Sequence, residues 1–346
     1  MSEPTPSYEA AGVSIERGER ATGMMREAVE ATHGPQVVSY PNGFAGLYAL
    51  SSSYADPVLA SSIDGVGTKV LVAKALGYYA SIGEDIVNHC ANDVLATGAR
   101  PLLFLDYVAS GMLEPGSVAE VVRGAAEACG SLGVALVGGE TAEMPGLYGE
   151  GDFDVVGACV GACERTEVVT GERVRVGDAV IGLPSSGLHT NGYTLARKVL
   201  EDAGFSYLET PEGLGDLTIG EAYLAPHRAY VREVLALRDA VEVRGMSHIT
   251  GGGLLGNLPR ALGGLGARID TSAWKEPPVF GFIRSSGGVS EEEMRRVFNL
   301  GVGFCVVVRG EDDEVERALA VLREAGSDAR RIGEVVAEPG GGVEFV

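Results

Sequence analysis

One theme recurs along this sequence and limits the folds open to it: an apolar run, then a glycine-rich segment, then a helical pattern. In the first half, Val58–Ile63 reads as a buried strand that runs into Asp64–Lys69. Apolar residues then repeat at every fourth position and predict a helix that stops at Gly98: Ile82, Ile86, Cys90 and Val94. Strands that alternate with helices predict an α/β fold.

The rest of the first half continues this alternation. Leu102–Tyr107 and Val134–Val137 read as two more strands. Between them, Ser117 and Glu120 form an S-x-x-E capping box that predicts a helix start. The segment Gly138–Gly146 follows the second strand and is predicted to be a loop, because it is rich in glycine and proline.

The second half repeats the theme in pattern, though not in sequence. Val180–Leu183 leads through a polar glycine-containing loop into a helix predicted to end at Gly204. A glycine run after Thr250 precedes a predicted helix over Leu254–Leu262. Three further elements are predicted from caps and periodicity: a helix capped by Ser290, a strand over Val302–Val308, and an amphipathic helix containing Val315, Leu319 and Leu322.

The length of the chain predicts two domains. At 346 residues it exceeds what one hydrophobic core usually serves. A polar, turn-rich stretch at 164–178 is the expected boundary. We therefore expect an N-terminal domain over 1–168 and a C-terminal α/β domain over 169–346.

The charge of the chain restricts its ligands. The sequence has 27 Lys and Arg against 48 Asp and Glu, a net charge of −21, which argues against nucleic acid as a partner. A phosphorylated ligand would need local compensation from a metal ion, glycine-loop amides, helix N-termini and a few cations. The simpler interpretation is that most of these acids only keep the protein soluble.

Cysteine usage and hydropathy indicate the compartment. Five cysteines without a C-x-x-C pair, in a chain with no N-terminal signal pattern, predict a reducing, cytosolic environment. We expect the apolar surroundings of Cys129 to make it a core residue. Since no run of 18 apolar residues occurs, no membrane span is predicted.

The first candidate site follows the strand at Val58–Ile63. The segment Asp64-Gly65-Val66-Gly67-Thr68-Lys69 offers an acid for a hard cation, two glycines for close backbone approach, and a lysine for phosphate. It matches neither the Walker A pattern nor G-x-G-x-x-G. Taken alone, it also fits a plain glycine turn with a capping aspartate.

Further polar groups cluster in the first half. Four of them recur on one face of the predicted helix, with Asp93 beside it: Asp85, Asn88, His89 and Asn92. Such a face either binds a ligand or is simply solvated. Glu140 and Glu143 are candidate magnesium ligands, because Mg²⁺ prefers a few carboxylates together with water and phosphate oxygens. The alternative is a turn with incidental acids.

The second half holds two candidate anion loops. The first precedes a helix and offers hydroxyls and amides without a net charge: Ser185, Ser186, Gly187, Thr190 and Asn191. The second is Thr250-Gly251-Gly252-Gly253, although a glycine run also serves close packing. His189 is a candidate proton shuttle or phosphate ligand, whereas His248 is as consistent with a structural role.

Together these motifs resemble the phosphoribosylformylglycinamidine cyclo-ligases over nearly the whole chain. The most specific is G-G-E-T-A-E-M-P-G at Gly138–Gly146. The others follow in the order seen in that family: Ser7-Tyr8, Ala11–Val13, Asp64–Lys69, Asn92-Asp93, Phe104–Tyr107, Ser185–Tyr193, Ile249–Gly253 and Phe298–Gly303.

The resemblance implies two α/β domains, the N-terminal one closing a β-barrel with its copy in a homodimer. It implies ATP- and magnesium-dependent ring closure of formylglycinamidine ribonucleotide to 5-aminoimidazole ribonucleotide in purine synthesis. The magnesium ligands would be Asp64, Asp93 and Glu140. ATP would be bound by Asp64, Gly65, Gly67, Thr68, Gly138, Gly139 and Thr141. The substrate phosphate would be bound by Ser185, Ser186, Gly187, Thr190, Asn191, Gly251 and Gly252.

Lys69, Asp93 and His189 are the expected catalytic residues, with Lys69 neutralising the transferred phosphate and His189 assisting proton movement. Two other hypotheses remain open. One is a related ATP-dependent phosphotransferase, although the selenophosphate type carries an N-terminal reactive cysteine and residues 1–50 contain none. The other is a non-catalytic nucleotide-binding protein, which would bind ATP without turnover.

Overall fold

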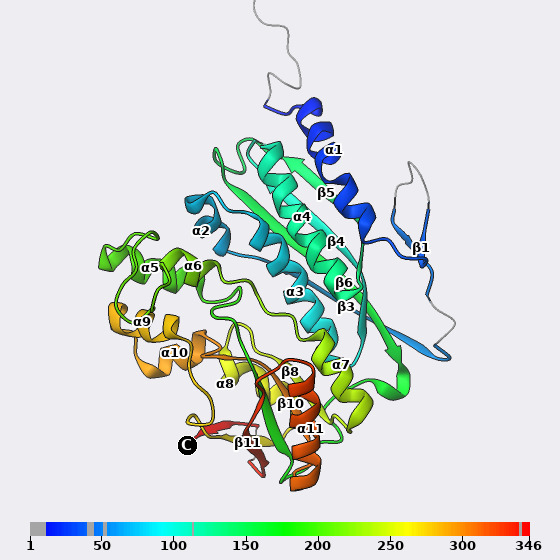
Figure 1. Ribbon diagram of the computed structural model, residues 1–346, viewed down its shortest axis with the longest axis vertical. Coiled ribbons are helices and arrows are strands. Elements are labelled where there is room, and N and C mark those ends of the chain that lie inside the picture. Colours follow the sequence, from blue (N-terminus) through cyan, green and yellow to red (C-terminus); the bar gives the residue numbers. More distant parts are fainter. Residues whose placement is uncertain (1–11, 40–44, 51–53, 113, 339–340) are drawn as a thin grey trace, which may run out of the picture. The chain divides into compact units, whose positions relative to one another are not determined.

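The computed structural model describes residues 12–39, 45–50, 54–112, 114–338 and 341–346, and shows two compact units (Figure 1). The first contains the described residues of Met1–Ser53, Ser61–Cys90 and Leu102–Val160. The second contains those of Tyr54–Ala60, Ala91–Pro101 and Gly161–Val346. Each unit combines helices with a sheet, which confirms the mixed α/β prediction. The single domain limit at 168 stays a prediction.

The first unit is built on a four-stranded sheet of order β3-β6-β4-β5. Its strands are β3 (Pro57–Gly65), β4 (Arg100–Ser110), β5 (Ala135–Glu143) and β6 (Phe153–Glu164). Its helices are α1 (Ile15–Ala31), α2 (Lys69–Leu76), α3 (Ala80–Ala96) and α4 (Pro115–Leu132), and β1 (Val37–Val38) pairs with β2 (Leu47–Tyr48). The last turn of α3, Ala91–Ala96, belongs to the second unit.

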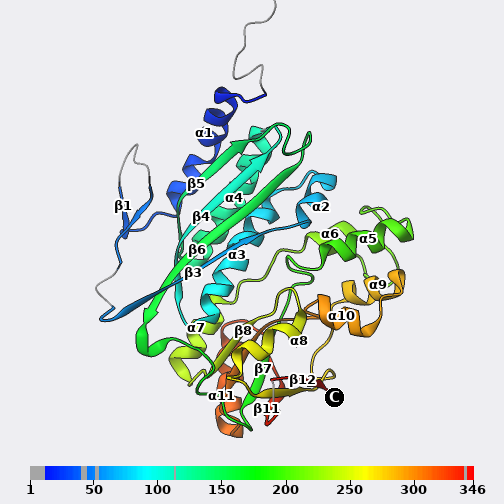
Figure 2. The ribbon, with the colours of Figure 1, turned by 180° about the vertical axis from the view of Figure 1, so that it is seen from behind.

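Helices α3 and α4 cover one face of this sheet, and Figure 2 shows the other face from behind. Two glycines let these helices approach closely: a Cβ on Gly83 would lie 1.8 Å from the Val121 carbonyl oxygen, and one on Gly124 would lie 2.0 Å from that of Ala80. Glycine costs about 1 kcal/mol in a helix interior. Here close packing of the two backbones offsets that cost.

The structure corrects two predictions in this unit. Helix α4 begins at Pro115 with Glu114 as its N-cap, which accepts from the Ser117 amide. The predicted partner in the capping box, Glu120, instead accepts from the Tyr79 and Ala80 amides at the start of α3. The S-x-x-E pattern therefore located the helix, but the helix begins about one turn earlier than predicted. Glu120 serves a contact between two helices and not a cap of its own helix.

The second correction concerns the glycine-rich segment. Residues Gly138–Glu143 continue β5 and pair in parallel with β4, so they are not a loop. The glycines have a packing role, since a Cβ on Gly139 would lie 1.9 Å from Asp106 Oδ1 on the neighbouring strand. Glycine therefore marks a close approach between strands here.

Helix α1 was not predicted. Ser14 is its N-cap and accepts from the Arg17 amide, 3.3 Å away. The buried Glu143 carboxylate at the end of β5 accepts from the Ser14 amide and pairs with Arg17 Nε at 2.9 Å. Glu143 therefore anchors α1. Its carboxylate, which was a candidate magnesium ligand, is already bound to Ser14 and Arg17. The resemblance motifs at Ser7-Tyr8 and Ala11 lie outside the described residues.

The second unit is built on a six-stranded sheet of order β12-β9-β11-β7-β10-β8. Its strands are β7 (Ala179–Pro184), β8 (Gly245–His248), β9 (Gly266–Ile269), β10 (Val302–Val308), β11 (Arg330–Val336) and β12 (Val343–Phe345). The strand pairings in this sheet are antiparallel except that of β12 with β9. Strand β10, which lies between β7 and the edge strand β8, is buried along its whole length.

The helices of this unit are α5 (Tyr193–Ala203), α6 (Ile219–Leu224), α7 (Val231–Ala240), α8 (Gly253–Asn257), α9 (Pro278–Gly287), α10 (Glu291–Val297) and α11 (Asp312–Glu324). Short 3₁₀ turns occupy Arg165–Glu167 and Leu258–Ala261. The predicted stop at Gly204 and cap at Ser290 are confirmed. The predicted helix over Leu254–Leu262 instead breaks into α8 and a 3₁₀ turn before Pro259, which cannot donate to a helix interior.

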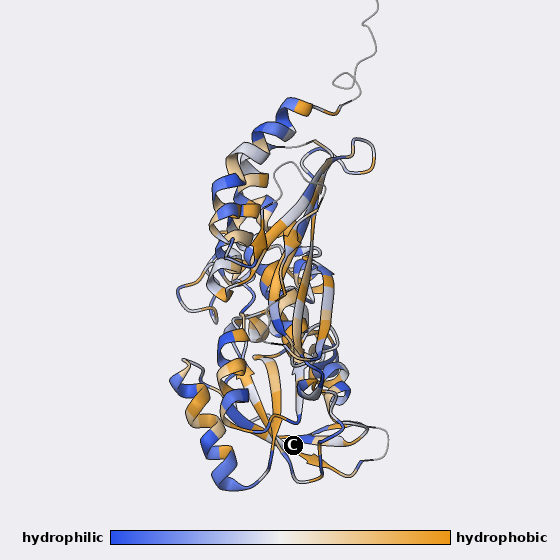
Figure 3. Ribbon diagram, turned by 90° about the vertical axis from the view of Figure 1, so that its right-hand side faces the viewer, coloured by the Kyte–Doolittle hydropathy of each residue, from blue (hydrophilic) through white to orange (hydrophobic). Residues whose placement is uncertain are grey.

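Hydropathy follows this layering, with hydrophobic strands and hydrophilic outer turns on the helices (Figure 3). All five cysteines are free and buried, as expected for Cys129. Among the described residues, none of the helices combines the length and the apolar character that crossing a bilayer would require.

Candidate active site

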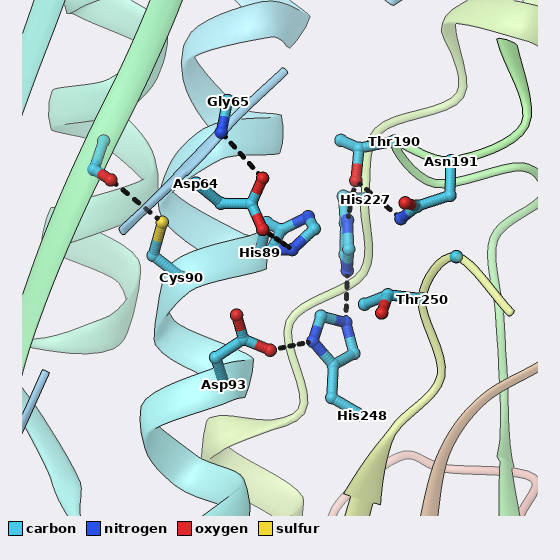
Figure 4. A network of polar contacts seen from close by, with 12 residues as sticks. Asp64, Gly65, His89, Cys90, Asp93, Thr190, Asn191, His227, His248 and Thr250 are labelled. Carbon is cyan, nitrogen blue, oxygen red and sulfur yellow. Dashed lines mark hydrogen bonds and ion pairs between the residues drawn. The ribbon is translucent and has the colours of Figure 1, made fainter. Parts of the chain in front are cut away.

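The Asp64–Lys69 segment joins β3 to α2 in the first unit. Asp64 lies at the end of the strand, Gly67 adopts a left-handed backbone with φ of 69°, and Lys69 is the first residue of α2. Asp64 Oδ1 accepts from the Gly65 amide at 2.7 Å, and Oδ2 lies 3.0 Å from His89 Nε2 (Figure 4). The Asp64 side chain remains 44% exposed, so its oxygens are accessible to a cation.

Lys69 is in a different environment from the one expected. Its side chain is fully buried, and its Nζ lies 2.7 Å from Asp85 Oδ2 on α3. Burial lowers the pKa of Lys69, while the Asp85 carboxylate opposes that effect. A buried charge needs such a partner. The role of Lys69 as a direct phosphate ligand stays a prediction, and this geometry favours an internal ion pair.

The other predicted nucleotide ligands of this unit lie on β5. Gly138, Gly139 and Thr141 line a cavity of about 420 Å³ together with side chains of α1 and Asp106 of β4. Glu140 is exposed on the same strand. Because β5 and β3 are opposite edges of the four-stranded sheet, three strand spacings of ~4.8 Å separate them by roughly 14 Å. A magnesium ion shared by Asp64 and Glu140 stays a prediction.

The first anion loop of the second unit connects β7 to α5. Asn299 organises it: its Oδ1 accepts from the Ser185 hydroxyl at 2.8 Å, and its Nδ2 donates to the Gly187 carbonyl at 2.8 Å. The Ser186 hydroxyl donates to the Pro226 carbonyl. Both serine hydroxyls thus make internal hydrogen bonds, and their role as phosphate ligands stays a prediction. Asn299 lies in one of the resemblance motifs, but no role was predicted for it.

His189 is held at the centre of this loop. Its φ of 62° is left-handed, which is uncommon for a residue with a Cβ. Its Nε2 accepts from the Ser186 amide at 3.3 Å, so the ring proton resides on Nδ1 when the imidazole is neutral. Gly303 of β10 makes room for the ring, because a Cβ there would lie 2.5 Å from His189 Cε1.

The second anion loop lies beside the first. A Cβ on Gly251 would lie 3.1 Å from Asn191 Oδ1, so the two predicted phosphate-binding segments meet. Gly252 has φ of 100°, and Asn257 Nδ2 donates to the Gly251 and Gly253 carbonyls at 3.1 and 2.9 Å. The glycines here are required by the turn and by proximity to Asn191.

Asp93, near the end of α3, meets a histidine of the second unit. Its Oδ1 lies 2.8 Å from His248 Nδ1, and His248 Nε2 lies 2.9 Å from His227 Nε2 (Figure 4). Asn92 binds the segment that follows His227. Its side chain accepts from the Tyr230 amide and donates to the Arg228 carbonyl, both at 2.9 Å. Sequence reasoning missed His227, which lies in an irregular segment and belongs to none of the motifs.

The comparisons with known proteins identify the family. The N-terminal domain model of the AIR synthase related proteins matches residues 45–163, and the C-terminal domain model matches 175–346. Phosphoribosylformylglycinamidine cyclo-ligase of Gloeobacter violaceus is 46% identical over 96% of this chain and 98% of its own length. Its counterpart in Sorangium cellulosum is 48% identical over 95% of each chain.

Solved structures share the fold at lower identity. Thiamine-monophosphate kinase of Stenotrophomonas maltophilia superposes with a TM-score of 0.70 at 16% identity, covering 93% of this chain and 95% of its own. The hydrogenase maturation protein HypE in complex with ATP gives 0.67 at 19% identity, covering 95% and 90%. The matches to both domain models and to full-length relatives show that this chain belongs to the AIR synthase related family and, within it, to the phosphoribosylformylglycinamidine cyclo-ligases.

Proposed function

We propose that this chain uses ATP to cyclise formylglycinamidine ribonucleotide to 5-aminoimidazole ribonucleotide, with release of ADP and phosphate, in purine biosynthesis. The observation that carries the proposal is identity of 46–48% to cyclo-ligases over nearly their whole length. The retained Asp64–Lys69 and Gly138–Gly146 segments support it. We further propose that the enzyme acts in the cytoplasm.

The chemistry needs an activated formamide, because its oxygen is a poor leaving group. The γ-phosphoryl group of ATP is transferred to that oxygen, which releases ADP and gives an imidate phosphate. The amidine nitrogen that bears the ribose then attacks the carbon, the ring closes, and phosphate leaves with the former formyl oxygen. The protein has to bind both reactants in line and stabilise the charge on phosphate.

Asp64 is our choice for a magnesium ligand. Its exposed carboxylate at a strand end offers oxygen to a hard cation, and magnesium supplies charge neutralisation to phosphates when it is bound. We propose that Asp93 interacts with His248 and does not bind magnesium, because His248 Nδ1 already contacts Asp93 Oδ1. Glu140 would reach the same ion as Asp64 only from a second copy of the chain.

For ATP we propose the β5 cavity lined by Gly138, Gly139 and Thr141, together with the turn at Gly65–Thr68. For the phosphate of the ribonucleotide we propose the adjoining Ser185–Asn191 and Gly251–Gly252 loops, whose net charge is zero. Lys69 would then act through its buried pair with Asp85, by fixing the start of α2 against α3.

We also propose that the first unit forms a homodimer through its sheet, closing a β-barrel with its copy. Two strands of this sheet carry exposed apolar side chains, Ile63 on β3 and Leu105 on β4. Ile63 is 72% exposed. An apolar sheet face of this kind is typical of an interaction surface. Light scattering should give twice the chain mass, and Ile63→Asp should give a monomer.

A matched control for the dimer is Leu208→Asp, which places a charge on an equally exposed leucine (75%) of the second unit. This variant should retain the dimer mass. A monomeric wild-type protein, or a dimer that survives Ile63→Asp, would contradict the use of this sheet face.

The activity test measures phosphate release from ATP by purified protein with Mg²⁺, with and without formylglycinamidine ribonucleotide, while a diazotisation assay follows the aminoimidazole product. Phosphate release that depends on the substrate and matches product one to one is the expected result. ATP turnover that ignores this substrate would point to a related phosphotransferase. ATP binding without turnover would point to a non-catalytic protein.

Asp64→Asn should lower turnover about 10²–10³-fold, which corresponds to several kcal/mol of lost charge stabilisation. Asp202→Asn, which removes an exposed carboxylate paired with Lys198 on α5, is the control and should leave turnover unchanged. Equal activity of the two variants would remove Asp64 from the metal site.

A further inference from the structure

The first unit contains a second cavity that the proposed function does not use. It has a volume of about 200 Å³ and lies where β4 ends and where α4 and β6 begin. Every residue that lines it belongs to the first unit. It shares no lining residue with the β5 cavity proposed for ATP, because Val121 of α4 lines this cavity and its neighbour Val122 lines the other. We call it the α4 cavity.

The inner wall of the α4 cavity is apolar. Val108 of β4 and Val118 and Val121 of α4 line it, and each of these side chains is at most 5% exposed. Two aromatic rings complete the wall: Tyr79 and Phe153 form an edge-to-face pair with ring centroids 5.6 Å apart and planes at 69°. A flat apolar ring would bury its surface against such walls, which favours its binding.

Ser110 adds one polar group to this apolar interior. It lies at the end of β4 and is 5% exposed, and its hydroxyl has no hydrogen-bond partner among the described residues. A buried polar group without a partner is costly and uncommon, so this hydroxyl points to a ligand. Because a hydroxyl both donates and accepts, a ligand with a donor next to an acceptor would satisfy it twice.

The charged groups of the α4 cavity disfavour an anion. Lys74 is already paired with Asp152 at 2.9 Å and donates to the Glu150 carbonyl at 3.3 Å. Glu114 accepts from the Ser117 amide at 2.7 Å, so the N-terminus of α4 has its own carboxylate. One cation and two carboxylates leave the lining with a net negative charge, which repels phosphate and carboxylate groups.

The volume limits the size of the ligand. An apolar cavity of roughly 150 Å³ holds benzene. The α4 cavity is somewhat larger, so it has room for one ring or for two fused rings. A nucleotide would add a ribose and a phosphate, which exceed this space and bring the charge that the lining repels.

We propose that the α4 cavity binds a neutral heteroaromatic ring whose edge carries a hydrogen-bond donor next to an acceptor, as the edges of free nucleobases do. The ring lies between the valines and the pair of Tyr79 and Phe153, and its polar edge exchanges two hydrogen bonds with the Ser110 hydroxyl. The site is separate from those proposed for ATP and the ribonucleotide, so it does not depend on the proposed function.

7-Azaindole is the probe, because it is neutral near pH 7 and carries an N–H beside a ring nitrogen that accepts. Indole is the matched probe, since it has the same shape and the same N–H but lacks the accepting nitrogen. Saturation-transfer NMR titration of the full chain measures both dissociation constants. For 7-azaindole we expect a value of about 1 mM or lower.

Ser110→Ala tests the contact with the hydroxyl. It should weaken 7-azaindole about tenfold, because two hydrogen bonds are lost, and indole about threefold, because only one is lost. The variant should fold, since this hydroxyl bonds no other described residue. Ser131→Ala is the control: it removes a hydroxyl of α4 that donates to the Ala128 carbonyl at 2.8 Å, and both affinities should stay unchanged.

Two further measurements locate the probe. Val118→Phe fills the α4 cavity and should abolish binding of both probes, while circular dichroism that matches the wild type shows that the variant is folded. Saturating ATP with Mg²⁺ should leave the dissociation constant of 7-azaindole unchanged. Displacement of the probe by ATP would place it in a nucleotide site and overturn the proposal.

The proposal would also be overturned if 7-azaindole did not bind the wild-type chain, or if Ser110→Ala weakened both probes equally. Binding that persists in a folded Val118→Phe variant would contradict it as well. The cyclo-ligase assay gives a separate result, because the α4 cavity has no lining residue in the site proposed for that reaction.

Discussion

Replacing Asp106 by asparagine should stabilise the protein, more at high pH than at low pH. Asp106 lies on β4, where its side chain packs against Gly139 of β5 and lines the cavity beside α1. Burial raises its pKa from 3.8 to about 6. Asparagine has the shape of the neutral carboxyl group and does not ionise.

The sign follows from which state binds the proton more tightly. Because the folded pKa is the higher one, the folded state binds more protons between pH 4 and 6, and stability falls as pH rises through that window. Above it, the ionised carboxylate lowers the free energy of unfolding by about 3 kcal/mol, and at pH 5 by about half of that. These are upper limits, because Asp106 is only half-buried and solvent in the cavity screens the charge.

Urea denaturation of the full chain at pH 8 and pH 5, fitted with separate transitions for the two units, measures the effect. Asp106→Asn should raise the free energy of unfolding at pH 8 and give roughly half that gain at pH 5. Glu316→Gln on the exposed side of α11 controls for the change in net charge. A gain of equal size at both pH values, or no gain at pH 8, would refute the assignment of a destabilising carboxylate.

Three other perturbations test the packing of the site. Gly303→Ala should lower the free energy of unfolding by about 1–3 kcal/mol, because its Cβ would lie 2.0 Å from the Tyr230 hydroxyl; urea titration checks this. Lys69→Met should cost about 3–5 kcal/mol by removing the cation beside the buried Asp85 carboxylate, and adding Asp85→Leu should recover most of it in a double-mutant cycle. Ser290→Ala should cost about 1 kcal/mol, measured in the same way, by removing the N-cap of α10.

Local patterns predicted several elements of the fold. The strand at Val58–Ile63, the helix after it and the helix ending at Gly204 each have a period or stop signal that operates within one element. Other elements depend on contacts with residues that are distant in the sequence. Residues Gly138–Glu143 look like a loop because their glycines relieve crowding with β4, and α1 is anchored by Glu143, 129 residues from Ser14.

The same distinction applies to the site. The motifs located the correct segments, since Gly251 and Asn191 do meet and Asp64 does end a strand. They did not predict which polar side chains are already paired with other side chains of the protein. Asp93 and Lys69 are residue types suited to a metal and a phosphate, yet each has a partner, His248 and Asp85, that only the tertiary structure supplies.

The internal pairing of these side chains affects how a chain with a net charge of −21 can bind anions. The cations that might have served are paired in the structure: Lys69 with Asp85, Arg228 with Glu233. A permanent free cation at the loop would also have to stay desolvated while the site is empty, which is costly. Backbone amides of the glycine-containing loops avoid that cost, because they carry no net charge while the site is empty.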